Sequence, residues 1–138
     1  MSDLTKSSDA GLEGNSGFNK TPQTRQAGVE IAAGDACYID SNGLFQKALS
    51  TNWMVTGSSG MIAFDGLAPK AIPSGTYGEI YGAGAEFFYA DSGLVIGTAL
   101  WVSNTAGKLA DARVAAATTD QPVAKVISAT NIVLLRGV

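Results

Sequence analysis

Two stretches of the sequence share one pattern, and this pattern limits the chain to short strands joined by tight turns. They are 34–48 (GDACYIDSNGLFQKA) and 97–111 (GTALWVSNTAGKLAD). Each begins with Gly, a small polar residue and Ala, and continues with an aromatic residue beside a β-branched one. Each then has a polar turn that ends in Gly, which tolerates the positive φ of a tight reversal. Because apolar and polar residues alternate around the turn, both stretches are predicted to be β-hairpins.

The segments that follow the two hairpins also correspond. A short apolar strand at 61–64 matches one at 123–127, and each is followed by a turn and a further strand. A duplicated unit of about 60 residues accounts for this, because repetition at a fixed spacing indicates repeated supersecondary structure. Two copies favour one pseudo-symmetric domain, since an open solenoid needs about three repeats or more. We expect pseudo-repeats near 28–84 and 85–138.

The range 28–138 is predicted to be a compact all-β domain, barrel-like or β-tulip-like, built from this duplicated hairpin unit. Strand patterns alternate with turn residues, and no stretch has a sustained 3.6-residue apolar period. The exception is residues 113–117, which are predicted to form a single helical turn because alanine favours helix. With 138 residues the chain can form a core without a metal or a disulfide. Its single cysteine, Cys37, is expected to be buried.

Residues 1–27 differ from the rest in composition. They are rich in Ser, Gly, Asn and Thr and carry three isolated apolar side chains, Leu4, Leu12 and Phe18. Such a segment buries too little apolar surface to offset the conformational entropy that it loses on ordering. We expect an extended polar arm that lies along a partner, with the three apolar side chains in pockets of the partner surface. A solvated tail is the alternative.

The segment 85–90 (AEFFYA) is the most aromatic part of the chain. As a strand it places Phe87 and Tyr89 on one face and Phe88 on the other. Large apolar groups on both faces indicate a strand in the core or at a subunit interface. Charged residues make up only 15% of the chain, against about 25% in typical domains. A weakly charged surface favours a subunit of an assembly, in which case we expect these three aromatic residues at the subunit interface. The alternative is a monomer with a neutral surface rich in Gly, Ser and Thr.

Several classes of function are disfavoured by the composition. The chain has no histidine, so a Ser-His-Asp or Cys-His catalytic set is impossible. The carboxylates nearest the aromatic segment, Glu79, Glu86 and Asp91, are interpreted as solvated charges. The DSNG motif at 40–43 lacks the later ligands of a calcium loop and is interpreted as an Asx turn. We therefore expect no enzyme activity, no cofactor and no metal.

Charge and hydropathy exclude two kinds of partner. The net charge is −3 and no basic cluster is present, which argues against nucleic acid. No apolar run is long enough to span a membrane, and the N-terminus lacks the pattern of a secretory signal. Binding to protein or to carbohydrate remains. For carbohydrate, Trp53, Trp101 or Tyr89 would stack on sugar rings if exposed, and core packing is the other interpretation of these residues.

The order of segments in the second half of the chain carries a resemblance to a known family. An aromatic strand is followed by GTALWV at 97–102, by a Gly turn and Lys-Leu, by PVAKV at 122–126 and by a last apolar strand. This order resembles that of the small decoration, or cement, proteins of tailed-phage heads. It covers residues 76–138, and the first repeat, 28–81, fits it more loosely. The polar segment 1–27 distinguishes this chain from the shorter members.

The resemblance implies a function as well as a fold. Such proteins are compact β-structures that bind as trimers over three-fold positions of the capsid lattice and carry no catalytic residues. The chain is therefore expected to be a homotrimer, with Phe87, Phe88 and Tyr89 at the trimer interface. Its partner would be the major capsid protein. It would be made in the host cytoplasm and located on the capsid surface of the virion, where it stabilises the head by bridging capsid subunits. A carbohydrate- or ligand-binding β-module of a virion or cell-surface protein is the alternative.

Overall fold

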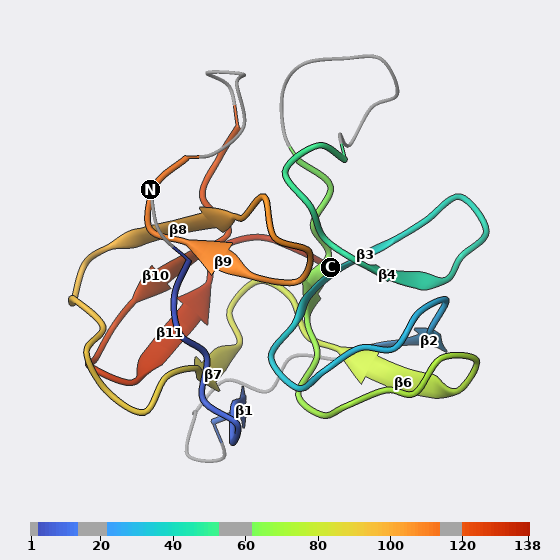
Figure 1. The fold of residues 1–138 in the computed structure, drawn as a ribbon, viewed down its shortest axis with the longest axis horizontal. Coiled ribbons are helices and arrows are strands. Elements are labelled where there is room, and N and C mark those ends of the chain that lie inside the picture. The colour runs from blue at the N-terminus through green and yellow to red at the C-terminus, as the bar shows by residue number, and fades with distance from the viewer. Residues whose placement is uncertain (1–2, 14–21, 53–61, 114–119) are drawn as a thin grey trace.

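The computed structural model describes residues 3–13, 22–52, 62–113 and 120–138, and these residues form an all-β fold without helices (Figure 1). Their strands are short. In chain order they are β1 (Gly11–Leu12), β2 (Gln23–Gln26), β3 (Ala36–Ile39), β4 (Phe45–Lys47), β5 (Gly66–Leu67), β6 (Tyr77–Ile80), β7 (Glu86–Phe88), β8 (Ala99–Val102), β9 (Leu109–Ala110), β10 (Ala124–Val126) and β11 (Asn131–Leu134). The all-β class expected from the sequence is thus confirmed. The helical turn expected at 113–117 lies almost wholly outside the described residues.

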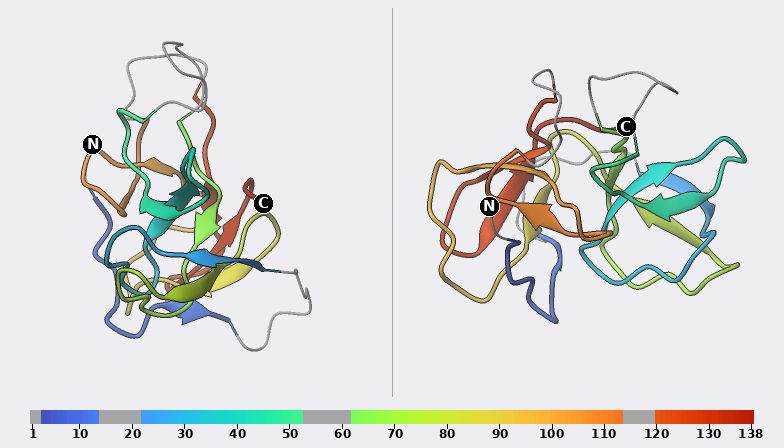
Figure 2. Two further views of the ribbon diagram at one scale, coloured as in Figure 1. Left: turned by 90° about the vertical axis from the view of Figure 1, so that its right-hand side faces the viewer. Right: turned by 45° about the horizontal axis from the view of Figure 1, so that its top comes forward.

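The strands form three antiparallel sheets. The largest has the order β1-β7-β11-β10-β8-β9 and curls into a half-barrel (Figure 1). The two smaller sheets have the orders β2-β6 and β4-β3-β5, and they lie beside each other at the opposite end of the molecule (Figures 1 and 2). The six-stranded sheet therefore uses the second half of the chain together with β1, whereas the two small sheets use residues 23–80.

Two hydrophobic cores hold these sheets together, and β3 contributes to both. The larger core packs the six-stranded sheet against the three-stranded sheet, with Phe87 and Leu100 from the former and Ala36 from the latter, all fully buried. The smaller core lies between the two small sheets and contains Cys37 and Phe45. Since neighbouring residues of a strand point to opposite faces, Ala36 and Cys37 enter different cores. The expected burial of Cys37 is confirmed.

The element that recurs in this fold is a glycine turn that precedes a strand. Five turns have a glycine with φ between +80° and +92° as the third residue, and a hydrogen bond of 3.1–3.2 Å from the amide of the fourth residue to the carbonyl of the first. This is the geometry of a type II β-turn, which requires positive φ at its third position. In all five, a strand begins two residues after the glycine, and the glycines are Gly34, Gly75, Gly84, Gly97 and Gly107.

The glycine turn corrects the interpretation of the two similar stretches. Both predicted hairpins are present, β3 with β4 and β8 with β9. However, the neighbour of β3 on its other side is β5, whereas that of β8 is β10, and the two hairpins belong to different sheets. The duplicated unit of about 60 residues is therefore not confirmed. The shared opening of the two stretches belongs to a turn that occurs five times, not to a larger repeat.

The described parts of residues 1–27 belong to the folded body and do not form a free arm. Asp3 forms a bridge with Ala110 of the edge strand β9, and β1 pairs with β7 near the opposite edge of the same sheet. The N-terminal segment, blue in Figures 1 and 2, thus connects both sides of the half-barrel. Further along, β2 pairs with β6. The extended arm is therefore not confirmed in the described residues, because a polar segment can be ordered by main-chain hydrogen bonds to sheet edges, which need no apolar side chains.

One buried carboxylate, that of Asp35, joins three parts of the chain. It accepts a hydrogen bond from the Ala32 amide at 2.9 Å and forms ion pairs with Lys6 at 2.5 Å and Lys47 at 3.5 Å. Its side chain is 6% exposed and that of Lys6 is 10% exposed. Gly107 packs on the carboxylate so closely that an added Cβ would lie 3.0 Å from its Cγ. Asp35 therefore connects the N-terminal segment, the three-stranded sheet and the second hairpin.

We predict that Asp35→Ala lowers the free energy of unfolding by about 3–5 kcal/mol, because it leaves the buried Lys6 ammonium without its partner. Urea denaturation followed by tryptophan fluorescence measures the change. The matched control is Asp9→Ala at an exposed position of the same N-terminal segment, which should change the value by less than about 0.5 kcal/mol. Equal effects of the two substitutions would contradict the assigned role of Asp35.

Candidate functional site

The turn before β8 differs from the other four glycine turns in the side chains at its first two positions. Here they are Val95 and Ile96, each 70% exposed. In the other four turns the same positions hold Ala-Ala, Pro-Ser, Gly-Ala and Thr-Ala. Because small or polar residues satisfy this turn elsewhere, its geometry does not require two branched apolar side chains. Val95 and Ile96 therefore need another explanation.

Main-chain hydrogen bonds fix this turn to the β10–β11 hairpin. Gly97 donates to the carbonyl of Val126 at 2.9 Å, and Val126 donates to Thr98 at 2.9 Å. Just before the turn, Leu94 donates to the carbonyl of Ala129 at 3.1 Å. The two exposed side chains are thus presented on an anchored backbone. A partner that covers them would pay little conformational entropy for ordering the backbone.

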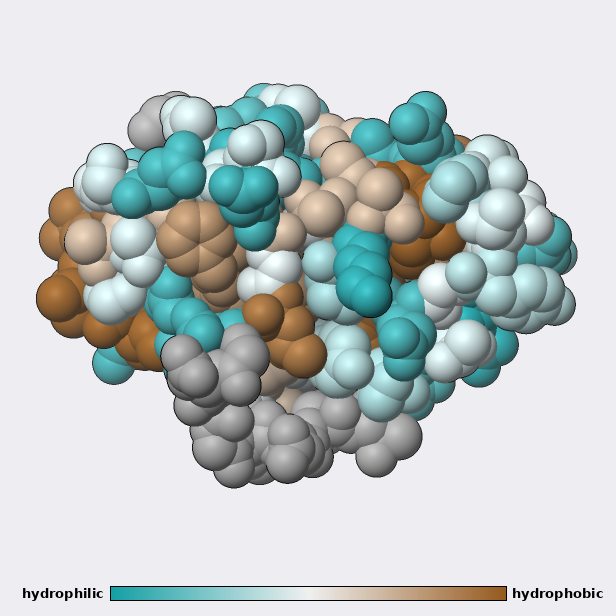
Figure 3. Space-filling model, turned by 90° about the horizontal axis from the view of Figure 1, so that it is seen from below, coloured by the Kyte–Doolittle hydropathy of each residue, from teal (hydrophilic) through white to brown (hydrophobic). Residues whose placement is uncertain are grey.

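An apolar hollow lies beside the turn. It has a volume of about 110 Å³ and is lined by Leu4, Gly93, Leu94, Val95, Thr98, Leu100, Asp111 and Val126. Ile127, which follows β10, is 40% exposed at the same end. We call this hollow, together with Val95, Ile96 and Ile127, the apolar end. Figure 3 shows hydrophobic residues gathered at the end where Figure 1 has the loop between β7 and β8. A contiguous exposed apolar patch of this kind marks an interaction surface.

The expected trimer interface is wrong for two of its three residues. Phe87 and Tyr89 are fully buried in the larger core of the same chain and reach no surface that a second copy could contact. Burial also raises the pKa of the Tyr89 hydroxyl well above its ordinary value. Phe88 lies on the other face of β7 and is half-buried. The face of β7 that carries Phe87 and Tyr89 packs on the core, so the core interpretation of these two residues is correct.

The three apolar residues expected in the arm lie in different environments or outside the described residues. Leu4 packs against the larger core, and its amide donates to the carbonyl of Leu109 at 3.0 Å. It therefore forms part of the hollow in its own chain. Leu12 in β1 is 40% exposed, and Phe18 lies outside the described residues.

The aromatic residues named for sugar binding are not exposed platforms in the described part of the chain. Tyr89 is buried, Trp53 is outside the described residues, and Trp101 is half-buried. The indole nitrogen of Trp101 is itself buried. The large exposed aromatic side chain among the described residues is Tyr77, at 74%, which the sequence did not single out.

Two of the carboxylates near the aromatic segment accept hydrogen bonds from residues far away in the sequence. Glu86 accepts a hydrogen bond from the Asn131 amide at 2.7 Å, and Asp91 accepts one from the Ser7 hydroxyl at 2.6 Å. Glu79 is exposed on β6. In the described ranges, no group of three or more His, Cys, Asp or Glu side chains is placed to hold a metal ion.

The expected Asx turn at 40–43 is confirmed. The Asp40 carboxylate accepts hydrogen bonds from the amides of Asn42 and Leu44, at 2.8 and 3.0 Å, and from the Gln46 side chain at 2.9 Å. These bonds, above all that from the Leu44 amide, hold the pKa of the Asp40 carboxyl below its usual range. The carboxylate is thus occupied by its own turn.

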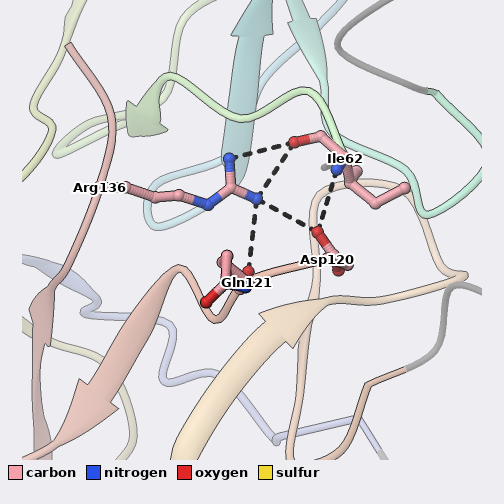
Figure 4. A network of polar contacts seen from close by, with 4 residues as sticks. All are labelled: Ile62, Asp120, Gln121 and Arg136. Carbon is pink, nitrogen blue, oxygen red and sulfur yellow. Dashed lines mark hydrogen bonds and ion pairs between the residues drawn. The ribbon is translucent and has the colours of Figure 1, made fainter. Parts of the chain in front are cut away.

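A polar network near the C-terminus was not predicted from the sequence. Both terminal nitrogens of Arg136 donate to the carbonyl of Ile62 at 3.1 Å, and Nη2 lies 3.5 Å from Asp120 and from the carbonyl of Gln121 (Figure 4). The Ile62 amide donates to Asp120, whose side chain is 1% exposed. The guanidinium also lies over the Phe64 ring, 5.7 Å from its centre. Burial lowers the pKa of Arg136, whereas Asp120 acts in the opposite direction.

This network holds together segments that are far apart in the sequence. Ile62 precedes β5, Asp120 precedes β10 and Arg136 follows β11. The C-terminal Arg136 connects Ile62 and Asp120 through charge-assisted hydrogen bonds, which are stronger than neutral ones. Its role is structural.

Comparisons with known proteins gave no match to a family model, to a curated protein or to a solved structure. Within the described ranges, no helix is present that is long and apolar enough to cross a membrane.

We predict that Arg136→Met lowers the free energy of unfolding by about 3–5 kcal/mol, because it strands the buried Asp120 carboxylate. Adding Asp120→Asn to this variant should recover part of the loss, since the second change removes the stranded charge. Arg25→Met, at an exposed arginine, is the matched control and should have little effect. Thermal unfolding of the unchanged protein, of each single variant including Asp120→Asn, and of the double variant measures the coupling. Additive losses in the double variant would contradict it.

Proposed function

We propose that the protein is a capsid decoration protein that binds the outer surface of a phage head and stabilises it by bridging major capsid subunits. In this proposal it acts as a homotrimer, is made in the host cytoplasm and resides on the virion surface. The resemblance of residues 76–138 to decoration proteins supports the proposal, as does the all-β fold. The observation that carries it is the apolar end, where Val95 and Ile96 are 70% exposed on an anchored turn.

The physical basis of such binding is the transfer of exposed apolar surface out of water. Burying one Val or Ile side chain contributes about 1.5–3 kcal/mol, so each copy offers a modest contact. Three linked copies multiply such contacts through effective concentration. Ligands that bind only the assembled lattice stabilise it in proportion to RT ln(1 + [L]/Kd) at each site. A protein without catalytic activity can therefore strengthen a head.

The alternative function, a carbohydrate-binding module, is favoured by one specific observation. The ring of Tyr77 is 74% exposed, and Tyr77 lines a hollow whose other lining side chains are mostly polar. Its lining residues belong to β2, β6 and the turn of the β3–β4 hairpin. Figure 1 shows these strands at the end of the molecule opposite the loop between β7 and β8. The two functions therefore depend on different surfaces and can be tested separately.

We predict that Val95→Asp combined with Ile96→Asp weakens binding to empty heads by about a hundredfold or more, which corresponds to the loss of two buried apolar side chains. Co-sedimentation with the heads measures the affinity. Because both residues are exposed, the denaturation midpoint should stay unchanged. Val29→Asp, at an exposed apolar residue outside the apolar end, should bind like the unchanged protein. Equal binding by the double variant would exclude the apolar end as the contact surface.

We also predict that heads carrying the protein retain their DNA to a higher temperature than bare heads, because binding stabilises only the assembled state. Adding the purified protein to bare heads should restore the difference, and analytical ultracentrifugation should find a trimer. DNA release at the same temperature from both kinds of head would refute the proposed function. So would a failure of the protein to bind the heads.

A further inference from the structure

A polar hollow lies between the β2–β6 sheet and the turn of the β3–β4 hairpin. It has a volume of about 270 Å³ and is lined by Thr24, Arg25, Gln26, Asn42, Gly43, Leu44 and Tyr77. The volume suits one sugar ring or a ligand of similar size. Figure 3 shows mostly hydrophilic side chains toward this end of the molecule. The lining contains one positive charge and no carboxylate.

The positive charge in the hollow belongs to an arginine without a partner. Arg25 is exposed, and within the described ranges its guanidinium makes no ion pair and no hydrogen bond. Its Nη1 lies over Gly43, where an added Cβ would be only 3.3 Å away. The guanidinium thus rests against the hairpin turn with its donors unused. A planar fork of donors of this kind is suited to a carboxylate, which it binds through two parallel hydrogen bonds.

An aromatic ring and neutral polar groups complete the lining. Tyr77 is 74% exposed and is paired in register with Gln26 of β2. The Gln26 side-chain amide donates to the carbonyl of Gly75 at 2.7 Å, which holds the turn before Tyr77 and leaves the amide oxygen as an acceptor. Thr24 and Asn42 add a hydroxyl and an amide. An exposed aromatic ring beside a few convergent polar groups is typical of a ligand site.

The walls of the hollow are fixed before any ligand arrives. The Asp40 carboxylate accepts hydrogen bonds from the amides of Asn42 and Leu44, which hold the hairpin turn in place. The Gln46 side chain donates a third hydrogen bond to it. On the other side, β2 and β6 are paired over four residues. A site built on paired strands and a closed turn needs little reorganisation on binding.

We propose that this hollow binds a uronic acid residue of an acidic polysaccharide. The Arg25 guanidinium binds the sugar carboxylate, the Tyr77 ring stacks on the apolar C–H face of the pyranose, and the neutral polar groups bind its hydroxyls. A single arginine matches one carboxylate charge. The exposed ring matches a pyranose and would have no role toward a bare inorganic anion. The proposal goes beyond capsid decoration and does not depend on it.

The first test is a titration of the folded protein followed by amide NMR. The probe is a hexasaccharide in which every second sugar is glucuronic acid. Its addition should shift the amide signals of Arg25, Gly43 and Tyr77 and leave that of Ile96 in place. A neutral glucose hexasaccharide should bind with an affinity at least about tenfold lower, because the charged hydrogen bonds are lost. Equal binding of the neutral sugar, or saturation by acetate at the same concentration, would overturn the proposal.

The second test uses exposed variants that preserve the fold. Arg25→Gln should weaken binding of the acidic hexasaccharide about tenfold or more, and Arg25→Lys should restore part of the affinity, since it keeps the charge without the fork. Tyr77→Ala should also weaken it. Lys125→Gln, an exposed residue of β10 with the same change in charge, is the matched control. An equal loss in this control, or no loss in Arg25→Gln, would refute the site.

The acidic-sugar site and capsid binding can fail independently. The double variant Val95→Asp, Ile96→Asp should bind the acidic hexasaccharide normally, and Arg25→Gln should bind empty heads normally. Loss of sugar binding in the former would place the sugar at the apolar end and refute the hollow as its site.

Discussion

The ion pair between Asp35 and Lys6 is the interaction on which the connected structure depends. Asp35 is the fourth residue of the fold's first glycine turn, directly before β3, and β3 supplies side chains to both cores. Lys6 lies in the N-terminal segment that spans the half-barrel from β9 to β7. The pair is nearly buried, and each charge is tolerable only because the other is present. The ion pair thereby connects the polar N-terminal segment to the centre of the molecule.

The same glycine turn precedes five of the strands. One local geometry starts β3, β6, β7, β8 and β9, each two residues after a glycine with positive φ. Because the backbone geometry is fixed by the glycine and one hydrogen bond, the first two turn positions are free to vary. Four of the five turns use small or polar residues there. The turn before β8 carries Val95 and Ile96 in the same geometry, so the same element serves as a strand start and as a rigid presentation of apolar surface.

The two candidate surfaces have different chemistry because they belong to different parts of the fold. The apolar end is formed by the loop before β8 and the β10–β11 hairpin of the half-barrel. The polar hollow is formed by the small sheets, where Arg25 of β2 faces the turn of the β3–β4 hairpin. The first offers exposed hydrocarbon and the second offers an unpaired guanidinium beside an exposed ring. In the proposed decoration protein, one surface contacts the head and the other contacts an acidic sugar.

The sequence by itself determined the features that depend on neighbours in the chain. The all-β class, the two hairpins and the Asx turn at Asp40 follow from alternation and turn residues that act within a few positions. Burial of Cys37 follows from residue type and strand pattern. These features are predictable because their hydrogen bonds are local.

Only the tertiary structure decided which strands lie side by side and which faces meet. It placed Phe87 and Tyr89 in the core, paired β1 with β7, and brought Arg136 to Asp120. Alternation assigns a residue to a face but does not say whether that face meets another sheet or a second copy. Likewise, composition does not reveal that a polar segment will find a free strand edge. These outcomes depend on contacts between residues far apart in the chain, which no local pattern specifies.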